Sequence, residues 1–125
     1  MLQVLDRLSG ENLIGISTHV LDTARGRAAM GVPVSLDVRT GGDWTRLIDS
    51  STDENGRAGN LIPSAIPLQR GTYRLRFDAA AYFRAQGVES FYSEICITFE
   101  VRNLGEHYHV PLLLSPWGYT TYRGS

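Results

Sequence analysis

The chain has 125 residues, 42% of them hydrophobic, which is enough for one domain with its own core and too few for two. A formal net charge of −1 provides no basic surface and argues against nucleic acid as a partner. With a single cysteine, no secretory leader and no apolar run near the roughly 18 residues of a membrane span, the sequence predicts a cytoplasmic protein that does not bind membranes.

The first dozen residues differ in character from the rest. Leu2, Leu5 and Leu8 recur at a spacing of three before Ser9 and Gly10, which suggests a short helical arm, with a tail as the alternative. We therefore divide the chain into an N-terminal arm or tail over residues 1–12 and a domain over residues 13–125.

Alternation of apolar and polar residues dominates that domain. It predicts half-buried strands over residues 16–22, 32–38, 73–77 and 91–101. The longest has a predicted inner face of Phe91, Ser93, Ile95, Ile97, Phe99 and Val101. Glycine-containing turns separate the runs, a spacing typical of an antiparallel β-sandwich. One short helix interrupts the pattern, with Asp78 as its N-cap and Gly87 as its stop. The predicted fold class is all-β.

Residues 52–57 form a predicted turn between two strands. The run TDENGR begins like a calcium loop but lacks the alternating acids and the downstream glutamate. A type I′ or bulged hairpin turn at Asn55 and Gly56 explains it better. Arg57 then leaves the turn with its guanidinium able to point at a neighbouring site.

The C-terminal residues form a predicted hairpin, with residues 107–114 and 119–122 as strands. If Pro116 and Trp117 are the central turn residues, paired positions sum to 233, and His109 faces Gly124 with Cα atoms roughly 5 Å apart. One end of the hairpin would then gather several polar groups and the terminal carboxylate, an arrangement that predicts a site. These groups belong to His109, Tyr122, Arg123, Gly124 and Ser125.

The three histidines are the main candidates for chemistry. Strand parity places His19 on one face with Ser17 and Leu21, and His107 on one face with His109. A strand histidine is often only a hydrogen-bonded surface residue, and the tail favours a functional role for His109. An alternative is a zinc site built from His19, His107 and His109.

Three motifs resemble the transthyretin-related 5-hydroxyisourate hydrolases. They are STHVLDTARGRAA at residues 17–29, TDENGR at 52–57 and HYHVPLLLSPWGYTTYRGS at 107–125, whose last four residues are that family's signature. The resemblance covers the chain from about Ile14 onward. It implies a transthyretin-like fold of two four-stranded sheets with one short helix, and a homotetramer with a central channel.

The resemblance also implies the reaction and the residues that perform it. The reaction is hydrolysis of 5-hydroxyisourate to 2-oxo-4-hydroxy-4-carboxy-5-ureidoimidazoline in urate degradation, with no cofactor and no metal. The family's catalytic residues fall on His19, Arg57, His109 and Ser125, and its substrate-binding tail on Tyr122, Arg123 and Gly124. His107 does not belong to that set.

The chemistry agrees with this assignment. Ring opening needs an activated water, stabilisation of an oxyanion and a proton for the departing nitrogen, which a neutral histidine and an arginine can supply. Which histidine is the base stays open, and we expect activity to fall below a pH of about 6.5.

A transthyretin-like small-molecule carrier is the other alternative. The carriers of this family have a lysine and a threonine in place of His19 and His109, and an acid in place of Arg57. They also lack the tail and are secreted. These differences favour the enzyme.

Overall fold

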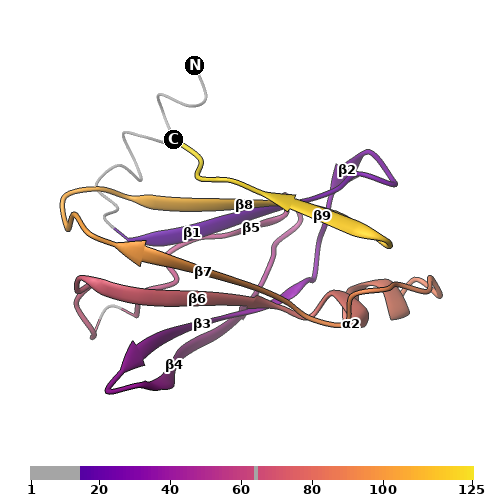
Figure 1. Cartoon of the computed structure of the whole chain (residues 1–125). Coiled ribbons are helices and arrows are strands. Elements are labelled where there is room, and N and C mark those ends of the chain that lie inside the picture. The colour runs from indigo at the N-terminus through magenta and orange to yellow at the C-terminus, as the bar shows by residue number, and fades with distance from the viewer. Residues whose placement is uncertain (1–14, 64) are drawn as a thin grey trace.

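Two β-sheets packed face to face make up the fold in the computed structural model, which describes residues 15–63 and 65–125 (Figure 1). In the first sheet the strand order is β2-β1-β8-β9, and β5 also pairs with β1. Its strands are β1 (Ile16–Asp22), β2 (Arg27–Ala28), β5 (Arg57–Ala58), β8 (Tyr108–Ser115) and β9 (Gly118–Thr121). The second sheet has the order β4-β3-β6-β7. Its strands are β3 (Pro33–Thr40), β4 (Asp43–Ser51), β6 (Gly71–Phe77) and β7 (Ile95–Val101). The predicted all-β sandwich is confirmed, with β5 as a short addition to the first sheet.

The core lies between the sheets and follows the alternation in the sequence. Ile16 and Leu112 of the first sheet and Leu36, Leu75 and Phe77 of the second are fully buried. Because side chains alternate along a strand, the residues between them point to the outer faces. The two outer faces are therefore where polar side chains of β1, β8 and β3 gather.

One predicted strand begins later than its pattern suggests. β7 starts at Ile95, which pairs with Phe77, the last residue of β6, so residues 91–94 have no strand beside them. The expectation that Phe91 lies in the core is wrong, because its side chain is 66% exposed. Its backbone N–H instead donates to the Pro116 carbonyl, and its ring contacts Tyr92 and Trp117.

The short helix α2 (Ala79–Arg84) follows β6 at one end of the sandwich (Figure 1). The Asp78 carboxylate accepts the backbone N–H of Ala81 at 2.9 Å, which confirms the predicted N-cap. The helix buries Tyr82 and Phe83, and Gly87 follows its end with a φ of +71°. A left-handed residue is a common way for a helix to terminate.

The predicted arm over residues 1–12 lies outside the described residues, so the division of the chain at residue 12 stays a prediction. Within the described ranges, no helix is long and apolar enough to cross a membrane.

Candidate active site

The C-terminal hairpin has the predicted register. Leu114 pairs with Tyr119, and further along the ladder His109 forms a bridge with Gly124, whose N–H donates to the His109 carbonyl at 2.8 Å. A Cβ atom added at Gly124 would lie 2.7 Å from the His109 Cδ2 and 3.2 Å from the Pro111 Cγ. The tail therefore lies directly against one edge of the His109 ring, and only glycine leaves room for it.

Strand β1 brings the other candidate residues to the same face of the first sheet. It runs parallel to β8, with Ser17 opposite His109, and antiparallel to β5, with His19 opposite Arg57. Ser17 and His19 are partly exposed, whereas Thr18 between them is buried. Because paired residues point to the same side of a sheet, His19, Arg57 and His109 share the outer face.

The loop before β5 positions Arg57. The Asp53 carboxylate accepts the backbone N–H groups of Asn55 (2.8 Å) and Arg57 (2.9 Å). Only Gly56 has a positive φ, +77°, in residues 53–57, which identifies the bulged turn and excludes type I′. A Cβ at Gly56 would lie 2.4 Å from the Val20 carbonyl oxygen, so the loop packs tightly onto β1.

His19 is held by this loop in a defined tautomer. Its Nε2 lies 2.9 Å from the Asn55 carbonyl oxygen. A carbonyl only accepts, so Nε2 carries the hydrogen and Nδ1 has the lone pair when the ring is neutral. Burial and the Arg57 charge lower the pKa of His19, against smaller opposing effects of the Asn55 carbonyl and Asp53. His19 is therefore neutral at pH 7 and can accept a proton.

His109 is held on its other side by a serine. Its Nδ1 lies 2.8 Å from the Ser17 Oγ, which is also 2.7 Å from the His107 Nε2. Burial, followed by the charges of His107, Arg57 and His19, lowers the pKa of His109 to about 4. Strand parity predicted that Ser17 shares a face with His19, but no local pattern indicates a role for it, because its contacts to β8 depend on the register of two distant strands.

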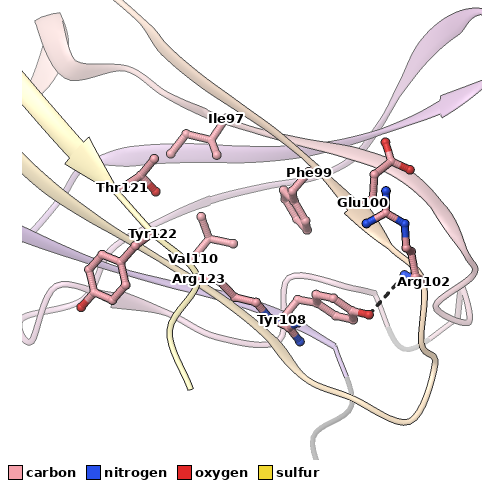
Figure 2. Close-up of a pocket in the computed structure, with 9 residues that line it drawn as sticks. All are labelled: Ile97, Phe99, Glu100, Arg102, Tyr108, Val110, Thr121, Tyr122 and Arg123. Carbon is pink, nitrogen blue, oxygen red and sulfur yellow. Dashed lines mark hydrogen bonds between the residues drawn. The ribbon is translucent and has the colours of Figure 1, made fainter.

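The tail residues divide between the two sides of β8. Arg123 donates to the Glu106 carboxylate at 2.8 Å and lies 4.5 Å from the Tyr108 ring centre, on the inner side. Figure 2 shows Arg123 beside Tyr108 at a cavity of about 290 Å³, and the Tyr122 ring turned away from them. Gly124 is the tail residue that contacts His109. Substrate binding by Tyr122, Arg123 and Gly124, and a catalytic role of Ser125, stay predictions.

The residues do not fit the alternative zinc site. Among the described residues, no group of three or more histidine, cysteine, aspartate or glutamate side chains is arranged to hold a metal ion. The His19 Nε2 donates to a backbone carbonyl, and the facing nitrogens of His107 and His109 both meet Ser17. The three rings therefore do not converge on one point.

Comparison with known proteins identifies the family. The sequence profile of the HIUase/Transthyretin family matches residues 16–124. The chain belongs to this family. It is 45% identical over 113 residues to the mouse 5-hydroxyisourate hydrolase, an alignment that covers 88% of this chain and 94% of the mouse protein.

Two solved structures have the same fold. The 5-hydroxyisourate hydrolase of Klebsiella pneumoniae has a TM-score of 0.73 at 36% identity, covering 88% of this chain and 92% of its own. Sea bream transthyretin in complex with thyroxine has a TM-score of 0.82 at 32% identity, covering 87% and 93%. Enzyme and thyroxine-binding protein therefore share this architecture, and the site residues must distinguish them.

Proposed function

We propose that His19, Arg57 and His109 form the catalytic centre with which this chain, a 5-hydroxyisourate hydrolase, opens its substrate. The observation that carries the proposal is the placement of two neutral histidines beside an arginine on one open face of the sheet. A cluster of this kind supplies a proton acceptor, a hydrogen-bond donor and a permanent positive charge.

These groups match the steps of the reaction. One histidine takes a proton from water while the water oxygen forms a bond to a ring carbonyl carbon. Arg57 and the second histidine stabilise the oxyanion that develops on the carbonyl oxygen. The carbon–nitrogen bond then breaks, and the first histidine returns its proton to the departing nitrogen. General base catalysis contributes on the order of 10² to 10⁴ in rate, and no step needs a cofactor.

A carrier function has less support. The backbone alone does not separate the two activities, since the TM-score is higher with the transthyretin than with the hydrolase. A carrier has no use for a histidine whose lone pair is kept available by a backbone hydrogen bond, as in His19. The site therefore favours hydrolysis.

The activity is tested with 5-hydroxyisourate generated by urate oxidase. We expect the purified protein to accelerate the decay of the ultraviolet absorbance of this compound, and the His19→Ala/His109→Ala double variant to fall to the rate of buffer. A wild-type protein that leaves the decay unchanged would disprove the function. Binding of thyroxine by such an inactive protein would support the carrier instead.

We also propose an oligomeric state, a cellular location and a metabolic role for the chain. The chain acts as a cytoplasmic homotetramer in purine degradation, with 5-hydroxyisourate from urate oxidation as substrate. Large exposed aromatic side chains support self-association, as do β7 and β9, each of which lies at one edge of its sheet. The most exposed are Phe91 (66%), Trp117 (65%) and Tyr122 (57%). Light scattering is expected to give the mass of four chains, and an active monomer would refute this.

A further inference from the structure

Ser17 connects two histidines through one hydroxyl group. Its Oγ lies 2.7 Å from the His107 Nε2 and 2.8 Å from the His109 Nδ1. The parallel register of β1 and β8 brings the three together, since Ser17 lies opposite His109 and His107 comes two residues earlier on the same face. The catalytic steps above use neither Ser17 nor His107.

Among the described residues the Ser17 hydroxyl makes hydrogen bonds only to these two nitrogens. It therefore donates its one hydrogen to one of them and accepts from the other, which gives two arrangements. In the first arrangement, the His107 Nε2–H donates to Oγ, and the Ser17 O–H donates to the His109 Nδ1. The hydrogen of neutral His109 is then on Nε2. The second arrangement runs in the opposite direction and places that hydrogen on Nδ1. The tautomers of the two rings are therefore linked through Ser17.

Two observations favour the first arrangement. It accommodates both the imidazolium form of His107 and its neutral form with hydrogen on Nε2, whereas the second requires a neutral His107 with a bare Nε2. In addition, His19 already provides the proton acceptor, because its Nε2–H is committed to the Asn55 carbonyl and its Nδ1 has the lone pair. Hydrolysis needs a donor toward the carbonyl oxygen as well.

The orientation of the His109 ring suits it as the hydrogen-bond donor toward the carbonyl oxygen. Nδ1 faces Ser17 on β1, and Cδ2 faces Gly124 in the tail. Nε2 is therefore at the outer end of the ring, and it makes no hydrogen bond to the protein within the described ranges. Protonation of the ring near neutral pH does not compete, because the pKa of His109 is lowered to about 4.

We propose that Ser17, supported by His107, is a positioning residue that holds His109 with its hydrogen on Nε2. His109 then polarises the substrate carbonyl together with Arg57, and His19 is the base that takes the proton from water and returns it to the leaving nitrogen. His109 keeps its own proton throughout, so the step balances without an imidazolate. The division of roles rests on the proposed function, whereas the tautomer of His109 does not.

The tautomer is measured directly, without substrate. Long-range proton–nitrogen correlation spectra of protein labelled with ¹⁵N-histidine distinguish a protonated ring nitrogen from a bare one. We expect protonated Nε2 and bare Nδ1 for both His19 and His109, with the signals assigned from His19→Gln and His109→Gln variants. A His109 protonated on Nδ1 in the wild-type protein would overturn the proposal.

Kinetics then test the positioning role. Ser17→Ala removes the link, so the His109 tautomer becomes mixed. We expect kcat to fall about 10-fold with KM unchanged, the lower end of the range for removing the hydrogen-bond partner of a metal-bound histidine. Ser17→Thr keeps the hydroxyl and should stay within about 2-fold of the wild type. His107→Gln retains an N–H donor toward Ser17 and should lose less than His107→Leu, which has none.

A matched control separates this effect from the loss of any strand hydroxyl. Ser115 lies at the other end of β8, where its hydroxyl donates to the Gly118 carbonyl at 3.1 Å. Ser115→Ala should leave the His109 spectrum and kcat unchanged. Equal losses in Ser17→Ala and Ser17→Thr, or an unchanged spectrum and kcat in Ser17→Ala, would refute the positioning role. An inactive wild-type protein would refute the proposed function alone, because the spectra are read without turnover.

Discussion

The outer faces of the two sheets both have polar clusters. The charged side chains are paired with one another on the second sheet, whereas Arg57 on the first sheet has no such pair within the described ranges. On the second sheet, the buried carboxylate of Asp37 is hydrogen-bonded by Arg46 and Arg74, and Arg39 and Arg74 stack on the Trp44 ring. Burial acts to raise the pKa of Asp37, yet the two arginines outweigh it and hold the pKa below the usual range. On the first sheet, no carboxylate among the described residues lies within ion-pair distance of Arg57.

This difference separates polar groups that stabilise the fold from polar groups that are available to a substrate. Ion pairs satisfy the charges around Asp37, so removing one member leaves the others uncompensated. His19 and His109 are each fixed by one hydrogen bond that leaves the other nitrogen unengaged by protein among the described residues. Substitutions on the first face should therefore lower activity with little change in stability. Substitutions around Asp37 should lower stability with little change in activity.

The largest expected effect is the loss of activity on the first face. His19→Ala, His109→Ala and Arg57→Ala should each lower kcat/KM by roughly 10² or more, because each removes proton transfer or oxyanion stabilisation. Thermal unfolding should change little, since all three side chains point away from the core. Decay of 5-hydroxyisourate absorbance gives the rate. Arg39→Ala is the control arginine on the second face, and full activity in Arg57→Ala would contradict the assignment.

The second face should respond in stability instead. Asp37→Ala is expected to cost about 2 kcal/mol, less than the ~3–5 kcal/mol for breaking a fully buried ion pair, because the Arg46 side chain is 42% exposed. Urea unfolding measures the loss, and kcat of the folded protein should be unchanged. Asp49→Ala removes an exposed partner of Arg46 and should cost little. A larger loss in Asp49→Ala than in Asp37→Ala would mean that burial does not decide the outcome.

Local patterns predicted much of this geometry. The alternation around His19 and around His109 predicted which residues share a face within each strand, and the turn at Pro116 and Trp117 predicted the bridge between His109 and Gly124. Both depend on neighbours in the sequence. The Ser17 contact joins residues 92 positions apart and depends on a parallel register that no local pattern contains.

The positions of Phe91 and Arg123 also have tertiary causes. Phe91 belongs to an alternating pattern, yet β7 begins only at Ile95, because β6 provides no partner beyond Phe77. Arg123 turns to the inner side of β8 because Glu106 and Tyr108 hold its guanidinium there. No local sequence pattern identifies these partners. The directions of the Phe91 and Arg123 side chains therefore could not be predicted from the sequence alone.

A smaller effect is expected where the tail meets the site. Gly124→Ala places a methyl group 2.7 Å from the His109 Cδ2, so the ring or the tail must move, and we expect kcat to fall about 10-fold. The melting temperature should be nearly unchanged, since the site of substitution is at the end of the ladder. Gly118→Ala in the same hairpin is the control, because its nearest neighbour would be 3.9 Å away. Equal activities of the two variants would show that the contact with His109 has no catalytic importance.

The smallest effect concerns pH. An unperturbed histidine would make activity fall below about pH 6.5, but the pKa of His19 is lowered by burial and by Arg57, and that of His109 is about 4. A lowered pKa keeps the neutral ring, and hence the acceptor on His19, at pH values where an ordinary histidine is already protonated. We therefore expect kcat/KM to change by less than about 2-fold between pH 7.5 and about 6.5 and to decline only at lower pH.

Arg57 provides a way to sharpen this expectation. Because its charge contributes to the lowered pKa of His19, Arg57→Gln should move the His19 titration to higher pH, although burial, the larger cause, remains. Titration followed by histidine proton resonances measures both rings independently of turnover. An ordinary pKa for His109 in the wild-type protein would show that its ring is more hydrated than the packing of Ser17 and Gly124 against it implies.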